Sequence, residues 1–333
     1  MDYINYVKQS PMQGMTGMWG GTGSNLVSGG AATLEPWGTR GVIMGGYTIP
    51  GGDNFDNIQY VTIGTTGNST NFGALTGATR SVGATSNNTR ALAFGGRNNS
   101  PTQSQNVIQY VTIAGGGSGA TDFGDLTLAT GYSAACSDGT KACNGGGTAA
   151  PGATAEIDVV TIDTTGNAAA HGDLQSVQDY LASYSSGTIG RGVWAGGRQF
   201  PAGQQISYKT IASSASTSDF GDLTLIGRGA LGGCSDGTRG VNWAGWGPST
   251  SDQNVIDYIT IASTGNATDF GDFTKVTDYA PGATSSETRG IQAGNQQDTT
   301  EIAYVTIQST GNATDFGNLN VGGAFTGCTA GNT

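Results

Sequence analysis

The sequence predicts an all-β protein, a six-bladed β-propeller built from four-stranded antiparallel blades. Three observations lead to this prediction. A unit of about fifty residues recurs six times along the chain. Each unit contains four short strand patterns, with no helical periodicity. Finally, the last unit stops after one strand, and the strand it lacks stands near the start of the chain. Repeated four-stranded units of this kind form a radial array of sheets.

The repeat is clearest in a segment that alternates β-branched or aromatic residues with polar ones and closes on isoleucine. It reads NIQYVTI, NVIQYVTI, EIDVVTI, ISYKTI, NVIDYITI and EIAYVTI in successive units. The closing isoleucines are 46 to 50 residues apart, at Ile63, Ile113, Ile162, Ile211, Ile261 and Ile307.

One repeat, residues 81–127, illustrates the four predicted strands. SVGATSN is short and made of small residues, and TRALAFGG alternates and ends in a glycine pair. NVIQYVTI has a period of two, which is typical of a half-buried strand, and TDFGDLT is a fourth short strand. We expect the first strand to lie nearest the axis, because six strands converge there and leave room only for small side chains.

The two ends of the chain predict how the ring closes. The final segment, GGAFTGCTAGNT, matches a first strand and then stops, while TRGVIMGG at residues 39–46 matches a second strand. We therefore expect the C-terminal strand to complete a blade whose other strands come from the N-terminal side. Such a clasp removes the exposed sheet edges that invite aggregation. The predicted domains are an N-terminal extension, residues 1–37, and the propeller, residues 38–333.

The strand order within the unit resembles the kelch repeat. A strand ending in Gly95-Gly96 is followed by a strand that carries Tyr110, and then by an outer strand led by Phe123. The outer strand departs from the kelch pattern, since it has DFGDL where a tryptophan is usual.

Composition excludes several functional classes. The formal net charge is −11, which argues against a nucleic-acid partner. There is no run of apolar residues long enough for membrane insertion, and no secretory signal pattern at the N-terminus. Glycine makes up 59 of 333 residues without a Gly-X-Y period, so we assign it to tight turns rather than to collagen.

Cysteine usage does not indicate a disulfide scaffold. Cys136 and Cys234 occupy the same repeat position, and Cys328 lies within one residue of it. Equivalent positions on different blades are poorly placed for bridging, so small buried thiols are expected. A shared metal site in the axial channel is the alternative.

Candidate catalytic groups are few. The single histidine, His171, stands where most other repeats have phenylalanine, so we interpret it as a packing substitute in an outer strand. One histidine cannot build a His-rich zinc or copper site. The aspartate pairs Asp122/Asp125, Asp219/Asp222 and Asp269/Asp272 recur from blade to blade. We favour turn capping and pairing with cations for them, with calcium binding in TGNATDFGD as the alternative. We expect no catalytic residue, no cofactor and no metal.

A basic residue begins each predicted second strand. In a closed ring these residues form a circle of cations: Arg40, Arg90, Lys141, Arg191, Arg239 and Arg289. One hypothesis is an anion- or carboxylate-binding face. The favoured interpretation is that each cation pairs with an acidic residue or a carbonyl of its own or a neighbouring blade.

Two features break the repeat. Trp194, Trp243 and Trp246 fall at or just after the ends of second strands, where exposed aromatics are candidates for stacking on glycans or for protein contact. Buried packing between blades is the alternative. The N-terminal extension combines aromatic, aliphatic and methionine residues, and we expect it to dock on another subunit rather than on its own propeller. The residues predicted to anchor it are Tyr3, Ile4, Tyr6, Val7, Met12 and Met15.

The repeat region resembles a group of degenerate kelch-like proteins of tailed bacteriophages, notably marine ones. TRGVIMGG, NVIDYITIASTGNATDFGD and the leader YINYVKQSPMQGMTG carry this resemblance. It implies a non-enzymatic virion protein in the tail, a fibre or the capsid decoration. Such a protein would be present in several copies, contact other virion proteins through the N-terminal extension and bind a host surface glycan or protein. A propeller-based carbohydrate-active enzyme or lectin that acts on host polysaccharide is the alternative.

Overall fold

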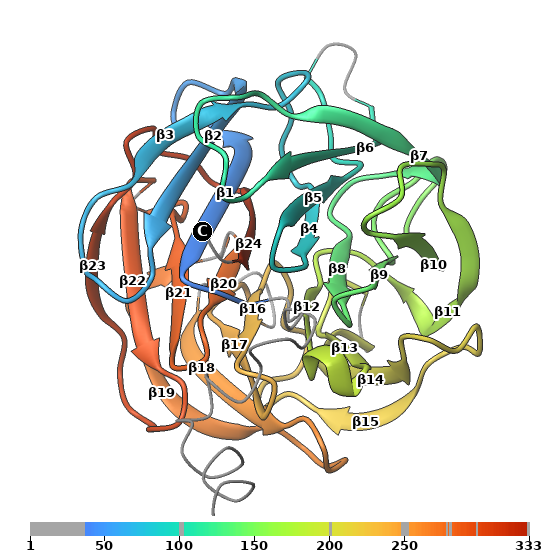
Figure 1. Cartoon of the computed structure of the whole chain (residues 1–333). Helices are drawn as coiled ribbons and strands as arrows, with labels where there is room; N and C mark the ends of the chain where they lie inside the picture. The colour runs from blue at the N-terminus through green and yellow to red at the C-terminus, as the bar shows by residue number, and fades with distance from the viewer. Residues whose placement is uncertain are drawn as a thin grey trace, which may run out of the picture. The chain divides into compact units, whose positions relative to one another are not determined.

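In the computed structural model, six four-stranded antiparallel sheets surround a central axis as blades (Figure 1). The structure describes residues 37–99, 103–199, 202–247, 253–277, 279, 282–297 and 299–331. These residues contain 24 strands and two short 3₁₀ helices, η1 (Gly187–Ile189) and η2 (Ala202–Gln204). The predicted six-bladed, all-β architecture is confirmed.

We number the blades along the chain, and each runs from an inner strand to an outer one. Blade 1 consists of β24 (Gly327–Gly331), β1 (Arg40–Tyr47), β2 (Asn54–Thr62) and β3 (Thr70–Ala74). Blade 2 consists of β4 (Gly83–Ser86), β5 (Arg90–Phe94), β6 (Gln105–Thr112) and β7 (Thr121–Thr130). Blade 3 consists of β8 (Ala134–Ser137), β9 (Lys141–Gly145), β10 (Thr154–Thr161) and β11 (Ala169–Gln178). Blade 4 consists of β12 (Ala182–Ser185), β13 (Arg191–Ala195), β14 (Gln205–Thr210) and β15 (Ser218–Asp222). Blade 5 consists of β16 (Gly232–Ser235), β17 (Arg239–Trp243), β18 (Gln253–Thr260) and β19 (Thr268–Thr277). Blade 6 consists of β20 (Ala283–Ser285), β21 (Arg289–Ala293), β22 (Glu301–Thr306) and β23 (Thr314–Asn318).

Blade 1 joins the two ends of the propeller. β24 pairs antiparallel with β1, from Arg40 opposite Gly331 to Met44 opposite Gly327. The predicted closure by the C-terminal strand is therefore confirmed, and every blade has the same four-strand order.

The inner strands β4, β8, β12, β16, β20 and β24 surround the axis (Figure 1). Five of the six, such as GATS, AACS and GGCS, are made of small residues, as predicted. The exception is β12, which reads ASYS and carries the buried Tyr184. Neighbouring blades also approach each other closely at the second strand. In β17 of blade 5, a Cβ atom added to Gly240 would lie 2.0 Å from the ring of Tyr184 in blade 4.

The hydrophobic core lies between the blades. Six clusters of buried side chains each join two neighbouring blades. In the cluster between blades 6 and 1, Ile291 and Phe316 meet Ile43 and Ile63. Each blade therefore buries its apolar faces against its two neighbours, as repeat units do. Among the described residues, no helix has the length and hydrophobicity needed to cross a membrane.

Candidate functional site

Five aromatic rings gather at one end of the central channel. They are Tyr132, Tyr180, Trp246, Tyr279 and Phe325, which we call the mouth cluster, and all five are half-buried. The rings of Tyr132 and Tyr180 stack with centroids 3.9 Å apart. Trp246 lies 4.9 Å from Tyr180, and Phe325 lies 4.6 Å from Tyr279. Sequence reasoning identified only Trp246 of this cluster.

The mouth cluster is positioned by the turns that lead into the inner strands. Tyr132, Tyr180 and Phe325 stand two residues before β8, β12 and β24, with φ of 59°, 62° and 57°. Ser81 and Ala230 hold the same place in blades 2 and 5, also with positive φ. Large residues rarely adopt this left-handed conformation, so the surrounding structure must impose it.

A chain of backbone hydrogen bonds imposes this conformation around the mouth. The amide of Ser81 donates to the carbonyl of Phe325, Tyr132 donates to Ser81, Tyr180 to Tyr132, and Ala230 to Tyr180. The four N···O distances are 2.8–2.9 Å. Each of these turns is therefore held by a backbone hydrogen bond to the turn of the neighbouring blade. An aromatic side chain at this position points to the shared mouth.

Trp246 and Tyr279 join the cluster from other loops. Trp246 follows β17 and forms an isolated bridge with Gly229. A Cβ atom at Gly229 would lie 2.7 Å from the indole nitrogen, so the indole packs directly on the backbone there. Tyr279 follows β19 and meets Trp246 edge to face, with centroids 5.3 Å apart.

A cavity of about 100 Å³ lies beneath the mouth cluster, inside the channel. Its walls are the first residues of the inner strands, mostly glycine, alanine and serine, together with Tyr132, Tyr180 and Phe325. Two buried polar atoms near Gly83, Oγ of Ser133 and Oδ1 of Asn144, have no hydrogen-bond partner among the residues that the structure describes. Most buried polar atoms in folded proteins have a hydrogen-bond partner, so these two atoms are exceptions.

Three arginines stack on aromatic rings at the same end of the propeller. The guanidinium carbon of Arg97 lies 5.5 Å from the ring centroid of Tyr132, and that of Arg198 lies 4.9 Å from Tyr180. Arg80 stacks on Tyr47 at 4.7 Å. Arg80 and Arg97 also face each other across an antiparallel bridge.

The arginines differ in their other partners. Arg198 forms an ion pair of 2.5 Å with Asp179, which is fully buried. Arg80 donates to Oδ1 of Asn54 at 2.7 Å. Arg97 has a buried Nε without a partner, and within the described part of the chain no group accepts a hydrogen bond from its guanidinium.

The two stacked phenols respond differently to this environment. Burial raises the pKa of Tyr180. Burial acts on Tyr132 in the same direction, but its hydrogen bonds with Tyr180 and Arg80 outweigh burial and lower the pKa of Tyr132. The positive charge of Arg80 thus favours the ionised form of Tyr132, a member of the mouth cluster.

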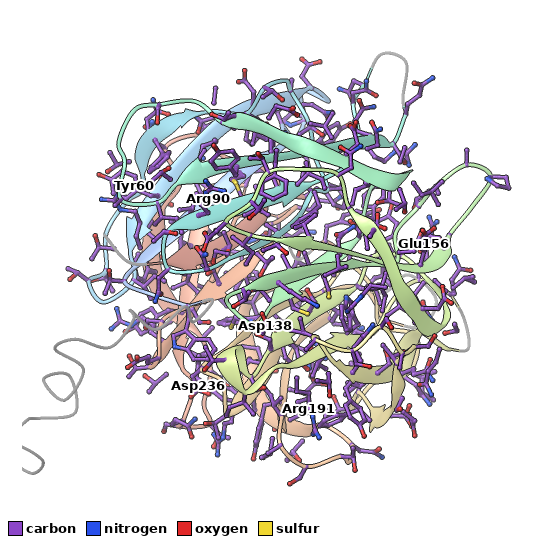
Figure 2. All side chains as sticks on the ribbon, turned by 45° about the vertical axis from the view of Figure 1, so that its right-hand side comes forward. Tyr60, Arg90, Asp138, Glu156, Arg191 and Asp236 are labelled. Atoms are coloured by element: carbon purple, nitrogen blue, oxygen red, sulfur yellow. The ribbon has the colours of Figure 1, made fainter. Side chains whose placement is uncertain are left out.

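The predicted circle of cations belongs to the scaffold. In five blades the arginine that begins the second strand donates from Nη1 to the isoleucine carbonyl of the next blade, at 2.7–3.2 Å. The same guanidinium lies 4.3–4.5 Å over the tyrosine ring of its own blade. The donors are Arg40, Arg90, Arg191, Arg239 and Arg289. Figure 2 labels Arg90 and Arg191 on two different blades, together with Tyr60. Pairing with a carbonyl of a neighbouring blade is confirmed for these five.

Blade 3 makes this connection differently. It has Lys141, Val159 and His171 where other blades have arginine, tyrosine and phenylalanine. Nε2 of His171 lies 2.7 Å from the carbonyl oxygen of Ile211, which is the equivalent acceptor in blade 4. His171 is 5% exposed, and burial lowers its pKa. The interpretation of His171 as a packing substitute is confirmed.

The DFGD strands also connect blades. Oδ1 of Asn167 accepts from the backbone amide of Asp125 at 3.0 Å, and Asn266 does the same for Asp222. Gly166 donates its amide to the carbonyl of Phe123. In blades 1, 3, 5 and 6, which have a TGN loop, this loop therefore docks on the outer strand of the preceding blade. The backbone capping accounts for the spacing between TGN and DFGD that recurs along this chain.

The opposite end of the channel is braced by serines. Ser137 Oγ donates to the carbonyl of Ser86, Ser185 to that of Ser137, Ser235 to that of Ser185, and Ser285 to that of Ser235. The O···O distances are 2.5–2.7 Å. Trp37 lines the channel at this end, together with Ser185 and Ser235. The two ends thus differ: hydrogen-bonded serines and Trp37 line one, and the mouth cluster lines the other.

All four cysteines are free and buried, as expected. The Sγ atoms of Cys136 and Cys234 pack against Gly192 and Gly290 of the next blade, and that of Cys328 packs against Gly282 of the preceding blade. Burial raises the pKa of Cys143, Cys234 and Cys328 to about 12. Within the described ranges, no three His, Cys, Asp or Glu side chains come together as metal ligands.

The structure corrects the prediction for two tryptophans. Trp194 and Trp243 are 1% and 0% exposed, so neither presents a face to a glycan or partner. Nε1 of Trp194 donates to the carbonyl of Ala134 in blade 3, and Trp243 packs edge to face on Phe273. Their position inside the interblade core was the alternative interpretation. Only Trp246 remains a candidate for ligand contact.

Three further aromatics of the mouth share a sequence signal. Tyr132, Tyr180 and Phe325 each precede a run of small residues, in GYSAAC, DYLAS and AFTGC. The residue two places before each inner strand identifies them.

The predicted anchoring residues Tyr3, Ile4, Tyr6, Val7, Met12 and Met15 lie outside the described residues. No protein-family model matches this sequence, and a search of the curated proteins found no match.

Proposed function

We propose that this chain is a non-enzymatic structural protein of a tailed bacteriophage particle, and that the propeller attaches the particle to a surface. The kelch-like strand order and the likeness to phage propellers support this proposal. The position would be in the tail, a fibre or the capsid decoration, with several copies in each particle. The N-terminal extension, residues 1–37, would hold the protein to other virion proteins.

The mouth cluster is the observation that carries the proposal. Most recurring polar side chains serve the contacts between blades, as Arg90 and Asn167 illustrate. The mouth has a different character, because its aromatic residues vary between repeats and remain half-buried. Clustered, partly exposed aromatic residues are typical of binding surfaces.

Deletion of residues 1–30 tests the attachment to the particle. We expect the truncated protein to fold with an unchanged melting temperature and to be missing from purified particles. Microscopy of particles that carry the full-length protein should place the propeller on the particle exterior. Normal incorporation of the truncated protein would contradict the anchoring role.

A lectin or carbohydrate-active enzyme is the second candidate, and the same aromatic mouth favours it. Of these, the enzyme differs from a structural attachment protein in that it turns over its ligand. Full-length protein incubated with host-surface polysaccharide should retain the ligand without releasing reducing ends. Release of new reducing ends, or of unsaturated sugar products, would replace the structural proposal by the enzymatic one.

A further inference from the structure

The geometry points to a carbohydrate site at the mouth cluster, specific for a sugar that bears a carboxylate. This inference rests on the proposed attachment function and names the class of ligand. The sugar ring would lie on Trp246, beside the Tyr132–Tyr180 stack, and a carboxylate of the same or the next sugar residue would meet Arg97 over Tyr132.

The aromatic rings supply the first part of the argument. The face of an aromatic ring carries partial negative charge, and it attracts the C–H bonds that line one face of a pyranose. Trp246 meets Tyr180 at 49° and Tyr279 at 85°, so the cluster is an uneven surface rather than one flat stack. Such a surface fits a puckered ring with substituents better than it fits a planar base.

Arg97 supplies the charge. Its guanidinium lies over the ring of Tyr132, which lines the cavity, and it makes no other polar contact within the described residues. A guanidinium presents a planar fork of donors that matches a carboxylate. By contrast, Arg80 donates to Asn54 and Arg198 is paired with Asp179.

The sign of the local charge favours an anion. The protein as a whole carries a net charge of −11, yet Arg97 and Arg198 stack on two rings of the mouth cluster. A third arginine, Arg80, stacks on Tyr47 at the same end of the propeller. In the part of the chain that the structure describes, Asp179 is the one carboxylate paired with any of them. A neutral sugar would not require this excess of cations at the mouth of an acidic protein.

The cavity limits the size of what enters it. At about 100 Å³ it holds the exocyclic groups of one sugar residue, and it is too small for a peptide strand. Ser133 lines it and leaves its buried Oγ without a partner. A hydroxyl group of the sugar would satisfy this atom, which a purely apolar ligand would not.

The test measures binding of full-length protein to oligosaccharides by isothermal titration calorimetry. The probes are oligomers of galacturonate, glucuronate and mannuronate and a sialylated lactose, each paired with a derivative whose carboxyl groups have been reduced to alcohols. We expect at least one acidic probe to bind and its reduced partner to bind at least tenfold more weakly. The affinity should also fall as salt is added.

Two substitutions address the two parts of the site. Arg97→Gln should weaken binding of the acidic probe at least tenfold and leave the weak binding of the reduced probe unchanged. Trp246→Ala should weaken both. Lys275→Gln is the matched control, because it removes a cation from the outer strand β19, where Lys275 pairs with Glu301. Melting temperatures within about two degrees of wild type would show that the variants fold.

The outcomes separate this inference from the proposed function. Equal binding of acidic and reduced probes, abolished by Trp246→Ala, would overturn the carboxylate specificity while leaving attachment intact. Binding of a hexaglutamate peptide as tight as that of the best sugar would overturn the assignment to a carbohydrate. If no probe binds while the protein is still found on particles, the sugar site is refuted and the structural role stands.

Discussion

Nη1 of Arg289 in blade 6 donates a hydrogen bond of 3.0 Å to the carbonyl oxygen of Ile63 in blade 1. The two residues are 226 positions apart in the chain. The guanidinium also lies 4.3 Å over the ring of Tyr304. This contact closes the circle of arginine braces across the junction between the last blade and the first.

Arg289→Met should therefore lower the free energy of unfolding by about 2–3 kcal/mol, since it removes a charge-assisted hydrogen bond and a cation–π contact. Urea unfolding followed by tryptophan fluorescence measures the change. Lys275→Met removes a half-exposed ion pair with Glu301 and should cost less than about 1 kcal/mol. Equal losses in the two variants would refute the bracing role.

The closure through β24 gives a second prediction. Removal of residues 323–333 deletes Phe325 and β24, leaving the edge of β1 unpaired and the core between blades 6 and 1 open. We expect this truncated protein to be insoluble or oligomeric, because an exposed edge strand pairs with other chains. Size-exclusion chromatography with light scattering measures this. A soluble monomer with a wild-type melting temperature would contradict the clasp.

Gly124 provides a third prediction, which concerns the contact between TGN loops and DFGD strands. Its φ is +149°, and a Cβ atom there would lie 2.4 Å from the carbonyl oxygen of Gly166. Gly124→Ala should cost about 2–4 kcal/mol through strain and displacement of the neighbouring loop. Gly77→Ala is the control, since nothing lies within 4 Å of its added Cβ. Urea midpoints that shift equally in both variants would count against the docking contact.

His171 provides a fourth prediction, which concerns pH. Burial lowers its pKa from the ordinary 6.5, so the unfolded chain binds the proton more readily than the folded one. Its contribution to stability is complete above pH 6.5 and is lost as the pH falls from there toward the lower pKa of the folded state. His171→Phe restores the residue of the other blades and should flatten the melting temperature between about pH 6.5 and pH 5. The same slope in both proteins would exclude His171 as its source.

Much of the architecture followed from sequence because the same physical demands recur six times. The small residues of SVGATSN and the alternation in NVIQYVTI identified the inner and third strands, and the C-terminal segment identified the clasp. The sequence also predicted that each arginine pairs with an acidic residue or a carbonyl of its own or a neighbouring blade. The identity of the partner in the next blade was not predicted, because contacts between blades join residues about 70 positions apart.

The sequence alone determined the repeat, the number of blades and the closure, since periodicity and strand patterning are local properties of the chain. Only the tertiary structure decided which aromatic residues are available to a ligand. Trp194 and Trp246 look alike in sequence, but one fills the core between blades and the other lies at the mouth. Tyr132, Tyr180 and Phe325 meet because the turns of separate blades converge on one axis. Convergence around a ring depends on the three-dimensional closure, which no single repeat contains.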